Sequence, residues 1–280
     1  MGLATKAAAD ASITFLFVFC MASLGAVSSA VAPFLGLQGS GKLYVVLGLV
    51  TALIFGFSAL GKALGGASWN PTALVAFAYA GVSKDTLFSL GVRMPAQMIG
   101  AVGGALAILE VMPKKYAHML GGPKLKVPLS VGVVAETVLT FALTLTVLWA
   151  ILRGPRNPSV KTGIIVVATI VLVMAGGAYT GPAMNPANAF AWAFVNNEHT
   201  SWEHFAVYWI GPMVGTVVSV WAFNLLFPPK RPVQKGGAVA NGQIDKKAEV
   251  VKADGSVRRR AKGATQEESV ADESSKQKAS

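Results

Sequence analysis

The sequence predicts an all-α integral membrane protein, in which six transmembrane helices and two half-helices form an inverted repeat of three plus three spans. The first observation is composition: of 280 residues, 53% are hydrophobic and only 13% are charged, about half the charged fraction of ordinary soluble domains. The second is that several apolar runs reach the roughly 20 residues that a helix needs to cross a bilayer. Buried strands of soluble proteins are far shorter, about four to eight residues, so these runs are predicted to be membrane helices.

Six runs are long enough to span a membrane, and they divide into two groups of three. In chain order they cover residues 12–32, 43–60, 87–109, 129–152, 163–179 and 206–227. Two shorter apolar segments, 72–80 and 187–194, cannot cross a bilayer alone. A loop with proline and lysine at 112–128 separates the groups, and 229–280 has the charged, aromatic-poor composition of a disordered basic tail. We therefore predict one membrane domain at 1–228, with repeats at about 6–110 and 129–228.

The third observation is that the two groups repeat one another's motifs in the same order. Each group has an acid at the start of its first span or within it, a glycine before an Asn-Pro pair, and two glycines four residues apart in its last span. The pairs are Asp10-x-x-x-Thr14-Phe15 with Glu136-x-x-x-Thr140-Phe141, Gly66-x-x-x-Asn70-Pro71 with Gly181-x-x-x-Asn185-Pro186, and Gly100-x-x-x-Gly104 with Gly211-x-x-x-Gly215. Because each group has an odd number of spans, the second must lie upside down relative to the first, an arrangement known from membrane proteins with inverted repeats.

Lysine and arginine near the span ends predict the orientation, because cytosolic loops of membrane proteins are enriched in these residues. The side that holds the N-terminus carries the larger set, so both termini are predicted to be cytosolic. That set comprises Lys6, Lys62, Lys84, Arg93, Arg153, Arg156, Lys161 and the Arg258-Arg259-Arg260 cluster of the tail. The other side carries Lys42 and four lysines of the central loop that depart from the rule, Lys114, Lys115, Lys124 and Lys126.

The two boxes, Asn70-Pro71-Thr72 and Asn185-Pro186-Ala187, are the strongest functional signal. Each follows a glycine-rich turn, and irregular backbone at membrane depth is tolerated only where protein buries it or where it lines a wet cavity. Asn is a preferred N-cap and Pro a preferred first helical residue, so each box is predicted to start a half-helix. The Asn amides keep N–H donors for a passing solute, and the positive ends of both helix dipoles point at the midplane. Together the boxes predict a pore, whereas Asn157-Pro158, in a polar loop, is expected to be a plain turn.

Asp10 and Glu136 have two candidate roles inside the membrane, a proton relay or acceptors for the exposed backbone of the broken loops. Their matching positions in the two repeats favour the structural role. Arg93 is expected to extend its side chain to the cytosolic surface. We predict no metal, cofactor, nucleic-acid partner or enzymatic activity. The three histidines lack metal-ligand spacing and are expected in loops: His118, His199 and His204.

The last five residues, Lys276-Gln-Lys278-Ala-Ser280, match the Lys-x-Lys-x-x pattern of retrieval signals to the endoplasmic reticulum. Such signals are addresses that a receptor reads. The pattern predicts residence in the endoplasmic reticulum.

Six spans, an inverted repeat and two half-helices that start with Asn-Pro boxes resemble the aquaporin (major intrinsic protein) family over about residues 6–228. Three details are similar to the first subgroup of the small basic intrinsic proteins of plants: Thr72 in the first box, the basic tail, and Asn188 after the second box. The resemblance implies a homotetramer with one pore per subunit, residence in the endoplasmic reticulum membrane, and passive conduction of water. Small neutral solutes are further candidates for passage.

The resemblance also implies a selectivity constriction on the non-cytosolic side of the boxes. Family spacing places it at four residues, which are Thr51 (Val50 if the turn lacks a gap), Val173, Pro182 and Asn188. Aquaporins generally carry Arg at the position of Asn188. Here none of the four is aromatic or charged, so the family's narrowing and its fixed charge are both expected to be lost.

Two other functions fit the same architecture. A secondary transporter would need a coupling acid that faces the solute path, and Asp10 and Glu136 are the candidates. A membrane scaffold with an occluded pore would act through its tail. A water channel is the function that the paired boxes favour.

Overall fold

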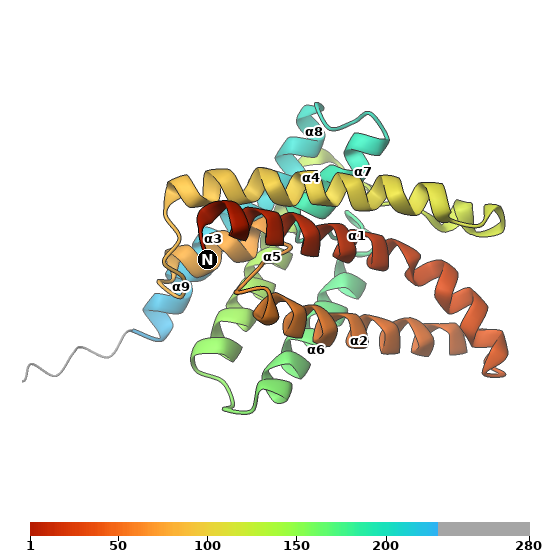
Figure 1. The fold of residues 1–280 in the computed structure, drawn as a ribbon, viewed down its shortest axis with the longest axis horizontal. Coiled ribbons are helices and arrows are strands. Elements are labelled where there is room, and N and C mark those ends of the chain that lie inside the picture. The colour runs from red at the N-terminus through yellow and green to blue at the C-terminus, as the bar shows by residue number, and fades with distance from the viewer. Residues whose placement is uncertain (229–280) are drawn as a thin grey trace, which may run out of the picture. The chain divides into compact units, whose positions relative to one another are not determined.

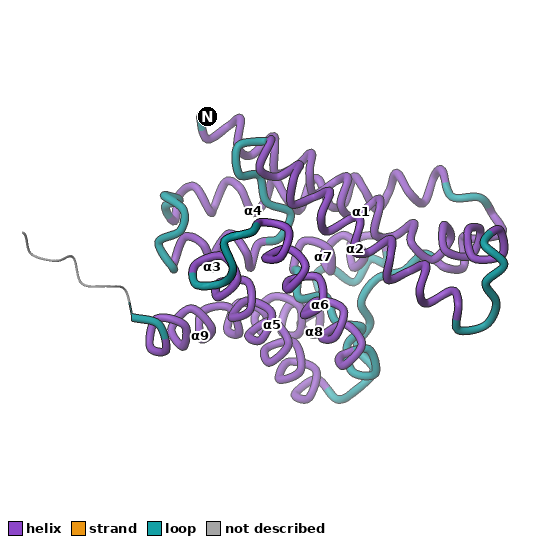
Figure 2. The backbone as a smooth tube through the Cα atoms, turned by 90° about the horizontal axis from the view of Figure 1, so that it is seen from below, coloured by secondary structure: helices purple, strands orange, loops and turns teal. Residues whose placement is uncertain are grey.

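The computed structural model describes residues 1–228, and the predicted tail, with Lys276 and Lys278, lies outside the described residues. Within residues 1–228 the chain consists of helices and loops, without strands (Figure 2). In chain order the elements are α1 (Leu3–Phe34), α2 (Gly41–Ala63), α3 (Pro71–Tyr79), α4 (Leu87–Val111), the 3-10 helix η1 (Lys114–Met119), α5 (Leu129–Leu152), α6 (Pro158–Gly176), α7 (Pro186–Val195), α8 (Trp202–Phe205), the π-helix η2 (Ala206–Ile210) and α9 (Gly211–Leu226).

Six helices of the described residues are long and apolar enough to span a membrane, which confirms the predicted spans. They are α1, α2, α4, α5, α6 and the continuous helix Trp202–Leu226, which combines α8, η2 and α9. The helices α3 and α7 have 9 and 10 residues, too few to cross a bilayer at 1.5 Å per residue. The predicted all-α membrane fold with two short helices is therefore confirmed.

Five of the six observed spans begin earlier or end later than the predicted apolar runs, because capping residues and turns continue the helices. The clearest case is α6, which begins at Pro158. Asn157 is its N-cap, and the side-chain oxygen accepts a hydrogen bond from the Ser159 N–H at 2.9 Å. The expectation that Asn157-Pro158 forms a plain turn is therefore wrong. The first turn of α6 is polar, so hydropathy did not show that the helix begins there.

The first and last spans of each repeat pack closely, and the paired glycines explain why. Gly100 of α4 lies against the backbone of Ala11 in α1, and Gly215 of α9 lies against the backbone of Thr137 in α5. A Cβ atom at either glycine would overlap the partner helix, so the small residue is what permits the approach. Figure 1 shows α1 and α4 running side by side along the bundle.

The short helices α3 and α7 lie inside the bundle, between the two repeats. α3 packs on α4, α5 and α9, while α7 packs on α4 and η2, and the two short helices also contact each other. Small residues allow this, because Ala187 and Ala191 of α7 form one buried cluster with Ala101 and Ala105 of α4. The packing brings the two Asn-Pro boxes together.

Candidate functional site

Each box starts a short helix with a side-chain cap. Asn70 is the N-cap of α3, and its Oδ1 accepts from the Thr72 N–H at 3.0 Å. Asn185 is the N-cap of α7, and its Oδ1 accepts from the N–H groups of Ala187 at 3.1 Å and Asn188 at 3.4 Å. A proline follows each Asn as the first helical residue, where its missing N–H leaves no bond unmade.

Each asparagine also donates a hydrogen bond to the loop of the opposite repeat. Asn70 Nδ2 donates to the carbonyl oxygen of Met184 at 2.9 Å, and Asn185 Nδ2 donates to that of Trp69 at 3.0 Å. Both acceptors are residues directly before a box, so the two bonds follow the symmetry of the repeats. An amide nitrogen carries two N–H donors. One donor of each Asn is therefore used across the junction, and one remains.

Thr72 gives the first box a further link to the opposite loop. Its hydroxyl lies 2.8 Å from Asn70 Oδ1 and 3.4 Å from the Met184 carbonyl oxygen, and the residue is buried. Ala187, at the matching place in the second box, has no hydroxyl. Two side chains of the first box thus bond to the opposite loop, whereas one side chain of the second box does.

Glu136 holds the second broken loop from inside the protein. Its carboxylate accepts from the Thr180 hydroxyl at 2.8 Å and from the N–H groups of Ala183 at 2.9 Å and Met184 at 3.0 Å. Met184 has a φ of 44°, a left-handed conformation that costs about 1–3 kcal/mol for a residue other than glycine. Its N–H is bound to Glu136 and its carbonyl to Asn70. Glu136 therefore fixes the acceptor that positions the Asn70 side chain.

Asp10 occupies the matching place in the first repeat, but it belongs to a buried ion-pair network. Its carboxylate accepts from the Ser68 N–H at 2.8 Å and from Arg93 at 2.7 and 2.9 Å. Arg93 also donates to Asp85 at 2.8 Å and to the Gly66 carbonyl at 3.2 Å. The expectation that Arg93 extends to the surface is wrong, because its side chain is 3% exposed. Two carboxylates and a loop carbonyl satisfy its donors inside the protein.

Asp85 connects this network to the end of the bundle that holds the N-terminus. It lies between α3 and α4, outside the spans, and Lys6 Nζ is 3.5 Å from its carboxylate. Burial opposes the ionisation of Asp85. Hydrogen bonds from Ser83 and Ser89 and the positive charges of Arg93 and Lys6 outweigh burial and lower the pKa of the Asp85 carboxyl.

Two further side chains brace the broken loops and were missed in the sequence. Gln97 Nε2 donates to the Ser68 carbonyl at 2.8 Å, and the Tyr208 hydroxyl donates to the Thr180 carbonyl at 2.9 Å. Each lies three residues before the first glycine of a pair. The glycine echo could have located them, although the two residue types differ.

His204 takes the place in the second repeat that Arg93 takes in the first, seven residues before the first glycine of a pair. It lies in α8 and is buried, so the expectation of a loop residue is wrong for it. Its ring packs against Phe190 and Tyr208, with centroids 6.4 and 5.7 Å away. Within residues 1–228 the hydrogen-bond donors to Glu136 are a hydroxyl and two backbone N–H groups, all neutral.

The four residues of the predicted constriction come from separate elements. Thr51 lies in α2 with its hydroxyl bonded within that helix at 2.7 Å, Val173 lies in α6, Pro182 precedes α7, and Asn188 is in the first turn of α7. Val173 is 44% exposed but lies seven residues after Val166, which is buried. Seven residues are about two helical turns, so Val173 lies on the same face of α6 as Val166. The role of these four residues stays a prediction.

Comparisons with known proteins give relatives over most of the chain. The family model described as "Major intrinsic protein" matches residues 2–223. The chain is 55% identical over 234 residues to "Aquaporin SIP1-1" of Oryza sativa subsp. japonica, a match that covers 82% of this chain and 95% of the relative. It is 46% identical over 236 residues to "Aquaporin SIP1-1" of Arabidopsis thaliana, covering 84% of this chain and 98% of the relative.

A solved structure has the same fold. The X-ray structure of the aquaglyceroporin from Plasmodium falciparum matches with a TM-score of 0.64 and 21% identity, covering 81% of this chain and 98% of that chain. At this identity the likeness shows the fold alone.

Proposed function

The chain belongs to the major intrinsic protein family, and on this premise we propose that it is a passive channel that carries water across a membrane. The observation that carries the proposal is a pair of hydrogen bonds that cross the junction. The side-chain amide of Asn70 donates one to the Met184 carbonyl, and that of Asn185 donates the other to the Trp69 carbonyl. These bonds fix both side chains and leave one N–H donor on each. A water molecule can offer its oxygen to two fixed donors. Small neutral solutes with similar acceptor groups are further candidates.

Cations meet an unfavourable potential at the same place. α3 and α7 both begin at the junction, and the N-terminal end of a helix is equivalent to about half a positive charge. A cation would have to lose water of hydration against these two ends, whereas a neutral water molecule does not. The mechanism requires no catalytic step, so we propose no enzymatic activity.

A secondary transporter is not favoured by the placement of the two membrane acids. Asp10 and Glu136 are each fully buried, and their oxygens accept from the broken loops and, for Asp10, from Arg93. An acid that couples transport must instead exchange its proton with the solute path. A scaffold with an occluded pore would act through the tail. A measurement that finds no water flux would distinguish it from a channel.

We further propose that Thr51, Val173, Pro182 and Asn188 form the outer constriction, with Val50 as the alternative to Thr51. All four side chains are neutral, so this barrier is electrically weak and the exclusion of ions depends on the junction. Asn188 is partly buried in the first turn of α7, three residues after the Asn185 cap. That spacing keeps its side chain near the box.

We propose residence in the endoplasmic reticulum membrane with both termini in the cytosol. The support is the sequence pattern of Lys276 and Lys278 and the surplus of Lys and Arg on the N-terminal side. Replacing both lysines with Ser should let part of the protein leave the reticulum. If the double variant remains fully reticular, the retrieval signal lies elsewhere.

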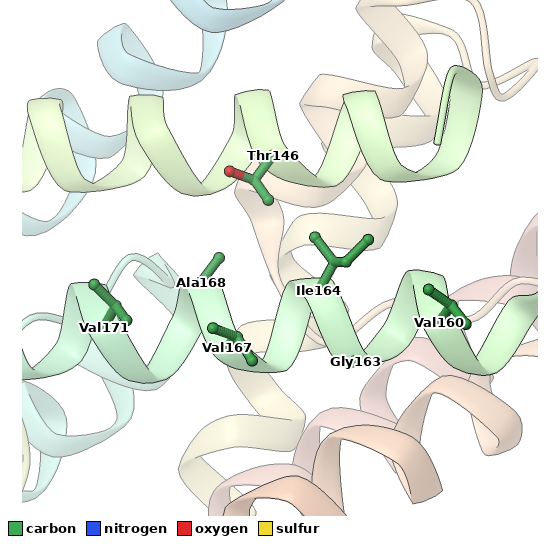
Figure 3. Close-up of a pocket in the computed structure, with 7 residues that line it drawn as sticks. All are labelled: Thr146, Val160, Gly163, Ile164, Val167, Ala168 and Val171. Atoms are coloured by element: carbon green, nitrogen blue, oxygen red, sulfur yellow. The ribbon is translucent and has the colours of Figure 1, made fainter. Parts of the chain in front are cut away.

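We also propose that the channel is a homotetramer. One surface that can receive a neighbouring subunit is the apolar groove between α5 and α6 (Figure 3), which is lined by Thr146, Val160, Gly163, Ile164, Val167, Ala168 and Val171. Val167 and Val171 are 62% and 57% exposed in the single chain, so either lipid or another subunit must cover them. Light scattering of the detergent-solubilised protein should give a protein mass of about four times 29.0 kDa.

Stopped-flow light scattering of proteoliposomes tests the channel itself. We expect the purified protein to raise osmotic water permeability above that of protein-free vesicles. Parallel gradients of glycerol and urea show which neutral solutes pass. Correctly folded protein that leaves water permeability at the protein-free level would favour the scaffold.

A further inference from the structure

The loop between η1 and α5 is fixed to the segment that leads into the second box. The Lys124 N–H donates to the Thr180 carbonyl at 2.9 Å, and the Lys126 N–H donates to the Tyr179 carbonyl at 2.8 Å. Gly122, two residues before Lys124, lies against the side chain of a buried residue in α7. The loop is therefore held against the segment that joins α6 to α7 and against α7 itself, and these contacts define the positions of Lys124 and Lys126.

Lys126 places its ammonium group at the end of α6. Its Nζ donates to the carbonyl oxygen of Gly177 at 2.8 Å, and Gly177 is the C-cap of α6, where the negative end of the helix dipole favours a cation. Gly176, the residue before it, packs on the proposed constriction, because an added Cβ there would lie 2.7 Å from Pro182 Cγ. The charge of Lys126 is thus held beside the constriction.

Within residues 1–228, Lys126 is the one positively charged side chain that hydrogen-bonds to the second loop, since Lys124 contacts that loop through its backbone N–H. The four proposed constriction residues are neutral. Glu136 binds the same loop through neutral donors, whereas Asp10 in the first repeat is paired with Arg93. A carboxylate behind a neutral constriction would attract cations to this opening unless a positive group opposed it.

We propose that Lys126 is a specificity-determining residue of the channel, whose ammonium group, fixed on Gly177, repels cations at the opening beside the constriction. The proposal rests on the proposed channel function. It also gives a role to one of the central-loop lysines that depart from the charge rule. Because the Lys126 side chain is exposed, dissolved salt screens its charge, and the repulsion must weaken as ionic strength rises.

The test compares the parent with Lys126→Gln, Lys126→Arg and the control Lys124→Gln in proteoliposomes. Water permeability and K⁺ leak are measured on the same vesicles at about 10 mM and about 1 M ionic strength, where the Debye length is about 30 Å and about 3 Å. Lys126→Gln keeps an N–H donor for Gly177 and removes the charge. We expect its K⁺ leak per unit of water flux to rise about threefold to tenfold at low salt, and less than about twofold at high salt. Lys126→Arg and Lys124→Gln should match the parent.

Each contrary outcome overturns the assignment for a distinct reason. An unchanged leak in Lys126→Gln removes the role of the charge. An equal rise in Lys124→Gln would assign the effect to the overall charge of the loop, and an equal rise in Lys126→Arg would assign it to loop structure. If the parent carries no water, the proposed channel fails and this inference fails with it. If the parent carries water and only the leak comparison fails, the channel stands and Lys126 has no part in its selectivity.

Discussion

Replacing Glu136 with Gln should loosen the loop that leads into the second box. In the parent, the carboxylate accepts from Thr180 at 2.8 Å, Ala183 at 2.9 Å and Met184 at 3.0 Å. Gln offers one acceptor oxygen and one NH₂ group. If the oxygen keeps the bonds from Thr180 and Ala183, the NH₂ group faces the Met184 N–H, and two donors then oppose each other in a buried site.

The size of the effect follows from these three bonds. A hydrogen bond to a charged group contributes about 1.5–3 kcal/mol, and a neutral one contributes about 0.5–1.5 kcal/mol. Losing the Met184 bond costs about 2 kcal/mol and weakening the other two costs about 1 kcal/mol each, so the free energy of unfolding should fall by about 3–5 kcal/mol. For a domain of about 200 residues, 1 kcal/mol shifts the unfolding midpoint by about 2–4 °C. The midpoint should therefore fall by about 6–20 °C.

Near-ultraviolet circular dichroism during heating in detergent measures this midpoint. The matched control is Glu203→Gln, which changes an exposed acid of α8 in the same way and should shift the midpoint by less than about 2 °C. Water flux through Glu136→Gln should also fall, because Met184 carries the acceptor for Asn70. A midpoint within about 2 °C of the parent, together with parental flux, would refute the role of Glu136 in holding this loop.

Three other predictions follow from the structure. The lowered pKa of Asp85 adds stability that is present above its unfolded-state pKa of about 3.9 and is lost as pH falls through its lower folded-state pKa. The thermal unfolding midpoints of the parent and Asp85→Asn should therefore converge below about pH 4. Parallel curves of midpoint against pH would contradict this. Asn188→Arg should lower urea flux and proton leak, while Asn196→Arg, at the other end of α7, serves as the control; parental urea and proton fluxes in Asn188→Arg would show that position 188 does not face the pore. Cys20 packs beside a buried hydrophobic cluster, so mercurials should leave water flux unchanged, and strong reversible inhibition would place this thiol in the pore.

The sequence predicted the spans and the short helices because both depend on local signals. Apolar length sets whether a helix can cross a bilayer, and the Asn-Pro pairs carry the N-cap and first-residue preferences that start a helix. The echo of motifs then paired the two halves. For this reason Asp10 and Glu136 were expected to accept hydrogen bonds from the broken loops. In the structure each carboxylate accepts a backbone N–H from the loop of its own repeat.

The contacts that the sequence did not predict join residues far apart in the chain. The two bonds across the junction connect residues 114 and 116 positions apart, and no local preference encodes them. Arg93 was misjudged for the same reason, since hydropathy treats a charge alone and its partner Asp10 lies 83 residues away. The residue types that brace the loops also differ between the repeats, Gln97 in one and Tyr208 in the other, so symmetry predicts their places and not their chemistry.

The most direct test of the central claim compares Asn185→Asp with the parent in proteoliposomes, measuring water permeability and cation leak on the same vesicles. The substitution removes an amide donor and puts an acceptor-only charge at the positive ends of the two short helices. We expect lower water permeability and a higher cation leak. A folded variant that conducts water and excludes cations as the parent does would contradict the central claim. That claim is that the Asn70 and Asn185 amides bind passing water at the junction and that the N-terminal ends of α3 and α7 exclude cations there.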